Sequence, residues 1–184
     1  MIGVLKKANP YLLLFLTGAA YWFSKVAYTF SIASMAAETM GMNHTTFLIT
    51  MSVVMVLFSA FLAKVLVYLS YRIVGVIFTR RSGMLYPFPL RYGEYSGIVL
   101  SFSFLCLMLC GLIGLPELFI PALSSVLGVI KTLVVWVFYF IGSKYFVDRF
   151  AHDYDRKALA TALSVVPFAL MGVTILLAVL EVAL

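Results

Sequence analysis

Charged residues are scarce in this chain of 184 residues, in which Asp, Glu, Lys and Arg together make up 11% and hydrophobic residues 64%. A soluble domain is about a quarter charged, so this chain lacks the polar groups needed to cover its own apolar surface. Its two cysteines, Cys106 and Cys110, have no histidine nearby in the sequence, and a structural zinc site needs four ligands. We therefore predict an integral membrane protein without a bound metal or cofactor.

Acidic residues are also few, and the formal net charge is +6. A continuous basic face would indicate nucleic-acid binding. Here the basic residues instead stand at the ends of hydrophobic runs, where they orient helices and contact anionic lipid head groups. We expect membrane lipids as partners, and no nucleic acid.

Five hydrophobic segments are separated by polar or Pro-rich breaks. Each reaches the ~20 residues that a helix needs to cross a bilayer, and backbone groups in lipid must be satisfied within the segment. The sequence thus predicts an all-α polytopic transmembrane bundle of five spans in a single domain, 1–184. The predicted spans are 10–36, 45–78, 95–114, 121–145 and 158–180.

The connecting segments differ sharply in basic charge. Ten of the 13 Lys and Arg residues fall before the first span, between the second and third, between the fourth and fifth, or just inside the ends of the second and fourth. They are Lys6, Lys7, Arg72, Arg80, Arg81, Arg91, Lys144, Arg149, Arg156 and Lys157. Residues 37–44, 115–120 and the C-terminus contain none. The positive-inside rule then predicts a cytoplasmic N-terminus and an external C-terminus, in what we expect to be a bacterial plasma membrane.

The second segment is longer than one span requires. As a single helix it would extend about 50 Å, so it must tilt, project into the cytoplasm or bend along the interface. Its latter half carries a polar stripe at helical spacing, and the Pro-broken segment 83–92 follows it. The stripe consists of Lys64, Tyr68, Tyr71, Arg72, Gly75 and Thr79. We expect Arg72, Arg80, Arg81 and Arg91 to contact lipid head groups.

Three lysines, Lys25, Lys64 and Lys131, lie inside hydrophobic segments. A charge at mid-bilayer costs from ~2.5 to above 10 kcal/mol, and we expect no acidic residue at comparable depth to pair with them. One interpretation is a ligand-binding site for an anion, lined by these lysines together with Tyr21, Tyr28 and Tyr68. The other is structural: the long stems reach towards the interface, or the amines make local hydrogen bonds.

No set of residues typical of an enzyme is present. No Ser/His/Asp or Cys/His combination converges at one depth, and no Gly-rich phosphate loop occurs. We therefore expect no catalytic residues and no enzymatic activity.

The order of features resembles the Yip-domain family of small five-span membrane proteins, in its bacterial branch. The resemblance rests on NPYLLLFLTGAAYW (9–22), KVLVYLSYRIVGVIF (64–78), VVWVFYFIGSKYF (134–146) and DRKALATALSVVP (155–167). It implies five helices and no catalytic residues.

Two functions remain open from the sequence. One is a non-enzymatic Yip-like scaffold or an accessory subunit of a membrane complex, as a homo-oligomer or with another membrane protein. The alternative is a transporter, channel or flippase for an anionic solute or lipid that uses the intramembrane lysines.

Overall fold

The computed structural model describes residues 9–41, 43–83, 88–150 and 155–165, and within those ranges its regular secondary structure is entirely helical. In chain order the elements are α2 (Pro10–Ser24), α3 (Val26–Met40), α4 (His44–Arg81), α5 (Tyr92–Gly114), the 3-10 turns η1 (Leu115–Leu118) and η2 (Pro121–Leu123), and α6 (Ser124–Phe150). A further helical stretch covers 156–165. The all-α class is confirmed. Three of the described helices are long and apolar enough to cross a membrane: α4, α5 with its 3-10 extension, and α6 with the turn before it.

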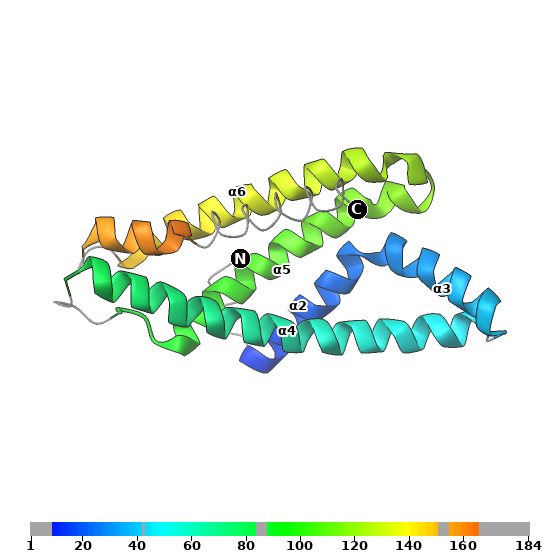
Figure 1. Cartoon of the computed structure of the whole chain (residues 1–184), viewed down its shortest axis with the longest axis horizontal. Coiled ribbons are helices and arrows are strands. Elements are labelled where there is room, and N and C mark those ends of the chain that lie inside the picture. The colour runs from blue at the N-terminus through cyan, green and yellow to red at the C-terminus, as the bar shows by residue number, and fades with distance from the viewer. Residues whose placement is uncertain (1–8, 42, 84–87, 151–154, 166–184) are drawn as a thin grey trace, which may run out of the picture.

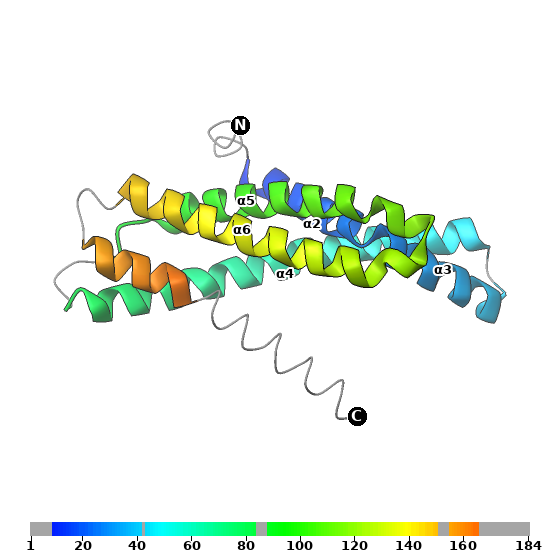
Figure 2. The same ribbon diagram turned by 90° about the horizontal axis from the view of Figure 1, so that it is seen from above.

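The middle of the arrangement is α5, with α2 and α6 packed against it and α4 running along the opposite side of α2 (Figures 1 and 2). In the most apolar stretch of α5, 44% of the residues are buried inside the chain, against 6% in the corresponding stretches of α4 and α6. The two outer helices therefore present most of their apolar surface outwards.

The first predicted span is two helices and not one continuous helix, because the chain breaks at Lys25. The Lys25 N–H donates to the carbonyl of Trp22, and the Ser24 hydroxyl donates to that of Tyr21. The Thr29 hydroxyl in turn donates to the Lys25 carbonyl. At this break α2 and α3 meet at a sharp angle (Figure 1). Each has 15 residues, or about 22 Å, which is less than a bilayer core.

The second segment is one unbroken helix. α4 has 38 residues, about 57 Å at the usual rise, and the Asn43 side chain caps its start by accepting from the Thr45 N–H. It runs the length of the molecule without a bend (Figure 1), so a helix that folds over to lie along the interface is the wrong alternative. A tilt or a projection beyond the bilayer accounts for its length.

The other segments differ from the predicted ones mainly at their ends. The third begins three residues early, at Tyr92, and the fourth extends to Phe150. The described part of the fifth, 156–165, is helical and is held to α6 by a hydrogen bond from the Tyr139 hydroxyl to the Leu163 carbonyl. The remainder of that predicted span, 166–180, lies outside the described residues.

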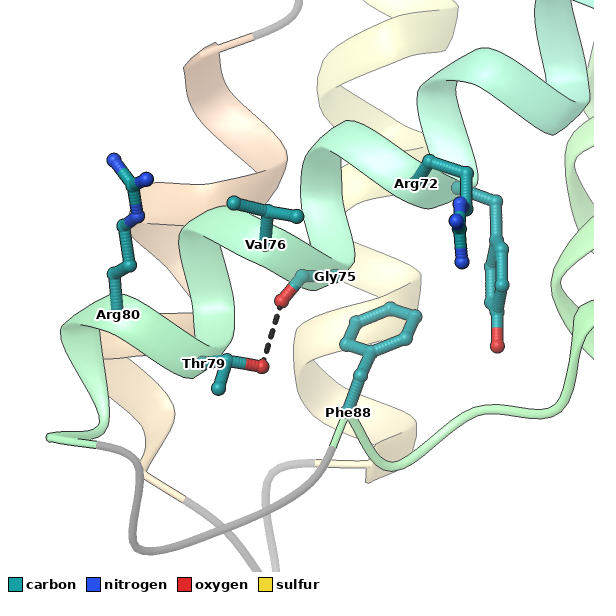
Figure 3. Close-up of a pocket in the computed structure, with 7 residues that line it drawn as sticks. Arg72, Gly75, Val76, Thr79, Arg80 and Phe88 are labelled. Carbon is teal, nitrogen blue, oxygen red and sulfur yellow. Dashed lines mark hydrogen bonds between the residues drawn. The ribbon is translucent and has the colours of Figure 1, made fainter.

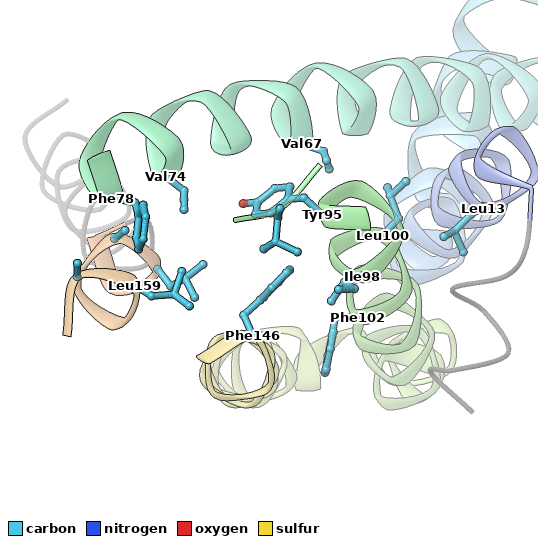
Figure 4. Close-up of a cluster of buried hydrophobic side chains, with 14 residues drawn as sticks. Leu13, Val67, Val74, Phe78, Tyr95, Ile98, Leu100, Phe102, Phe146 and Leu159 are labelled. Atoms are coloured by element: carbon cyan, nitrogen blue, oxygen red, sulfur yellow. The ribbon is translucent and has the colours of Figure 1, made fainter. Parts of the chain in front are cut away.

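The buried core lies where the C-terminal halves of α4 and α6, the start of α5 and the stretch 156–165 come together (Figure 4). Phe78, Ile98 and Leu159 are fully buried there. The Arg-rich C-terminus of α4 lies at the same end of the molecule. The buried core is therefore at the basic end of the molecule.

A glycine permits the close approach of α2 to α4. A Cβ added to Gly18 would lie 2.5 Å from the carbonyl oxygen of Val56 and 3.0 Å from the backbone nitrogen of Ala60. Backbone atoms of a long helix cannot move away locally, so a larger residue would force the helices apart. Close contact through small residues is how helices associate in membranes.

We expect Gly18→Ala to lower the free energy of unfolding by about 1–3 kcal/mol, because it overpacks this crossing. Thermal unfolding of the purified chain in one detergent measures the change. The matched control is Gly128→Ala in α6, where a Cβ meets nothing within 4 Å. That control should be neutral, or should gain up to about 1 kcal/mol from helix propensity. Equal melting temperatures for the two variants would contradict a tight α2–α4 contact.

Candidate functional site

Two groups of polar residues stand out on this helical frame. The first surrounds the predicted lysines Lys25 and Lys131, near the end of α5. The second is a groove on the side of α4, at its basic end. Lys64 belongs to neither group: it lies exposed part-way along α4.

Lys131 is paired, contrary to the expectation that no acid lies at its depth. Its Nζ is 2.7 Å from Oε1 of Glu117, and the two side chains are 19% and 15% exposed. Glu117 stands in the 3-10 turn that ends α5, where the chain reverses towards α6. That reversal brings a carboxylate from a segment end against the second turn of α6. The pair leaves Lys131 no net charge to offer an anion.

Lys131 reaches this acid by crossing the end of α5 at a glycine. A Cβ added to Gly114 would lie 2.6 Å from the Lys131 Nζ and 3.9 Å from the Ser24 carbonyl oxygen. Lys25 directly follows Ser24, so the break in the first segment adjoins the ion pair. Two of the three predicted lysines therefore gather near one end of α5.

The break at Lys25 leaves several donors without acceptors. The Lys25 side chain is exposed and, within the described part of the chain, makes no hydrogen bond or ion pair. The Trp22 Nε1, three residues earlier, is buried and has no partner among the described residues. No side chain caps the start of α3 either.

The predicted tyrosines do not converge on one site. Tyr21 lies on α2, one turn before Lys25, with 37% of its surface exposed. Tyr68 lies on α4 with its ring edge-on to that of Tyr92, 5.8 Å between centroids. The side chain of Tyr28 lies outside the described set. Lys25 and Tyr21 thus belong to the first polar group, and Tyr68 borders the second.

The groove has a volume of about 490 Å³ and uses four residues of the predicted polar stripe. Its lining residues are Tyr71, Arg72, Gly75, Val76, Thr79, Arg80 and Phe88. Arg72 and Arg80 lie on either side, with the Phe88 ring between them (Figure 3). The Thr79 hydroxyl donates to the Gly75 carbonyl at 2.9 Å. α4 thus supplies the floor and the charges, and the segment after α4 supplies one wall.

That wall is fixed by hydrogen bonds and by ring packing. The Tyr71 hydroxyl donates to the Leu90 carbonyl at 3.1 Å, and Leu90 itself is 2% exposed. The Phe88 ring lies 5.6 Å from that of Tyr71 and 5.8 Å from that of Phe78, both edge-on. Such aromatic pairs contribute about 0.5–1.5 kcal/mol each beyond their buried area. The returning segment is therefore held rigidly against α4.

The charge in the groove is uncompensated among the described residues. The ion pairs among the described residues are Lys131–Glu117 and the exposed pair Arg156–Asp148. Neither involves Arg72 or Arg80. Arg72 lies over the ring of Tyr68, with Cζ 6.0 Å from the centroid. The other two arginines predicted to meet head groups, Arg81 and Arg91, are exposed near the same end but do not line the groove.

The described residues include no group of three His, Cys, Asp or Glu side chains placed to hold a metal ion. Cys106 and Cys110 are free, buried thiols on α5, and the Cys110 Sγ lies 3.8 Å from the Lys131 carbonyl oxygen.

Two residues that shape these sites were not singled out from the sequence. Glu117 stands in the short connection between the third and fourth predicted segments, and nothing in its spacing indicates that it faces the fourth. Phe88 stands between two prolines in a loop, and nothing in its spacing indicates which helix it contacts.

Comparisons with protein-family models, with curated proteins and with solved structures find no match to this chain.

We expect Glu117→Gln and Lys131→Met each to destabilise the protein by about 3 kcal/mol, because each leaves a largely buried charge without its partner. The double variant should be less destabilised than the sum of the two, since it removes both charges. Chemical unfolding in a fixed detergent measures the three values. The control is Asp148→Asn, which breaks an exposed pair with 71% and 49% exposed side chains. It should cost less than about 1 kcal/mol. Additive losses would show that Lys131 and Glu117 do not interact.

Proposed function

We propose that this chain is a non-enzymatic, multi-pass membrane protein that serves as a Yip-like scaffold or an accessory subunit of a membrane complex. The proposal includes five spans with a cytoplasmic N-terminus, in a bacterial plasma membrane. The basic C-terminal end of α4 and the end of α6 lie at the same side of the molecule (Figure 1), which supports this orientation under the positive-inside rule.

The observation that carries the proposal is Lys64 on the outer face of α4. Its neighbours Phe61 and Leu66 are 65% and 55% exposed, so the ammonium emerges from an apolar surface. Among the described residues it has no hydrogen bond or ion pair. Ionisable groups within membrane segments usually pair with another group. A carboxylate on a helix of a partner subunit would supply that pairing.

The shape of the molecule supports the same proposal. In the most apolar stretches of α4 and α6, only 6% of the residues are buried within the part of the chain that the structure describes. Lipid tails are as apolar as leucine, so such faces alone do not drive helix association. A single polar group on the face does, because it gains a partner that lipid cannot offer. Lys64 is that group on α4.

A photo-crosslinking amino acid in place of Phe61 should give one defined adduct in intact membranes, because it lies one turn from Lys64 on the same face. Lys64→Leu should abolish the adduct while the level of inserted protein stays unchanged. Mass spectrometry of the adduct identifies the partner and its acidic residue.

The matched control is Lys144→Leu, which removes an exposed lysine at the basic end of α6 and should leave the adduct intact. Adducts to lipid alone, or an adduct that survives Lys64→Leu, would contradict the proposal.

The donors at the helix break favour a second candidate, transport of an anionic solute or lipid. In many transporters, broken membrane helices point their free backbone groups at the substrate near the bilayer midplane. Here the break brings together the Lys25 ammonium, the uncapped start of α3 and the unpartnered Trp22 Nε1. Lys131 would then act through its pair with Glu117, not as a free cation.

This second candidate is tested with proteoliposomes and radiolabelled inorganic phosphate. If it is correct, the wild-type chain takes up phosphate faster than empty liposomes, and Lys25→Met reduces uptake to the empty-liposome rate. Lys64→Met, on a different helix from the break, should leave uptake unchanged. Uptake by Lys25→Met at the wild-type rate would exclude a role for the break.

A further inference from the structure

We infer that the groove on α4 is a binding site for the phosphate group of one anionic lipid, with Arg72 and Arg80 as the residues that bind it. This inference does not depend on a partner subunit or on transport, because it uses neither Lys64 nor the break at Lys25. It is also narrower than general attraction of the basic end to the membrane, because it selects two of the four predicted arginines.

The two arginines of the groove have side chains suited to binding phosphate. Arginine presents five N–H donors in a planar fork that matches phosphate oxygens, and it stays charged at any depth. Arg72 and Arg80 are eight residues apart, about 12 Å along the helix axis. Both line the hollow, Arg80 at one end and Arg72 at the other, with their side chains pointing in opposite directions (Figure 3). Among the described residues no acidic side chain lines the groove, and neither arginine is in an ion pair.

The other walls of the groove are mainly apolar. The Thr79 hydroxyl already donates its hydrogen bond to the Gly75 carbonyl, so Thr79 lines the groove without offering a donor to a ligand. Phe88, Val76 and the Tyr71 ring make the remaining surface apolar. A small, fully hydrated anion gains nothing from such walls. The glycerol and first methylenes of a lipid do, which favours a lipid over a soluble phosphate.

The space in the groove depends on Gly75. Gly75 forms part of the floor, and a Cβ there would still be 3.9 Å from the nearest atoms, those of Phe88. The hollow therefore exists because this position has no side chain and because Phe88 is held off the helix by its packing against Tyr71 and Phe78. A larger residue at Gly75 would fill the groove without displacing the helix backbone.

The groove lies near the C-terminal end of α4. Before the groove, α4 is largely apolar and has Lys64 as its one Lys or Arg residue, and the groove ends at the Arg80–Arg81 pair. This transition is where the hydrocarbon core gives way to the head-group layer. Anionic lipids are enriched on the cytoplasmic side, where the charge pattern predicts this end to lie. The groove thus opens at the depth at which lipid phosphates occur.

The test is native mass spectrometry of the delipidated full chain, titrated with phosphatidylglycerol or phosphatidylcholine. We expect one phosphatidylglycerol to bind more tightly than the rest, and more tightly than phosphatidylcholine. Arg72→Gln/Arg80→Gln should weaken that first site about tenfold or more, because charge-assisted bonds to phosphate are lost. Gly75→Leu should weaken it similarly without any change of charge.

The matched control is Arg81→Gln/Arg91→Gln, which removes two exposed arginines at the same end but outside the groove. It should retain the first site. Melting temperatures without added lipid show whether each variant is folded, and Gly75→Leu and the charge variant test the site independently.

Three results would overturn the inference. Equal losses in the groove variant and its control would mean that lipid binds to a diffuse basic surface. Competition by millimolar inorganic phosphate would mean that the groove takes a soluble anion. Unchanged binding in both groove variants would mean that the lipid lies elsewhere.

Discussion

Tyr95 is the residue on which the arrangement of the helices most depends. It begins the buried part of α5, and its ring is stacked on Phe146 of α6 with 5.4 Å between centroids and an interplanar angle of 28°. The same ring packs against Tyr71 of α4, and its hydroxyl donates to Ser70 at 3.1 Å. One side chain thus joins the three long helices at the basic end and satisfies its own polar group there. Buried aromatic residues with a bonded hydroxyl combine packing with orientation.

The groove is a consequence of that junction. Tyr71 contacts both Tyr95 and Phe88, so the position of the returning segment follows from the packing of α5 on α4. The ring centroid of Phe88 in turn lies 6.3 Å from that of Tyr95. The wall of the groove and the core of the bundle therefore share residues. A site built on packed helices and a tethered segment is held more precisely than one on a free loop.

Much of this was predictable from the sequence, and the exceptions have physical causes. The helices follow from hydrophobicity, because backbone groups in lipid must bond within their own segment. The polar face of α4 follows from helical spacing. The break at Lys25 does not, since no Gly or Pro marks it and the Ser and Thr bonds to backbone carbonyls found there also occur in the unbroken helix α4. The partner of Lys131 does not either, because pairing with Glu117 depends on how α5 turns back towards α6.

The treatment of charge differs along the molecule in a way that bears on function. Lys131 is neutralised inside the chain, at the end of α5 where the helices are farther apart. Lys64 and Arg72 are not, and they lie eight residues apart on α4, two turns along one helix. Leaving them unpaired costs free energy in an apolar surrounding unless something outside the chain supplies the opposite charge. α4, whose most apolar stretch is only 6% buried, thus carries two charges without an ionic partner among the described residues, which is why both proposals above place a binding partner on this helix.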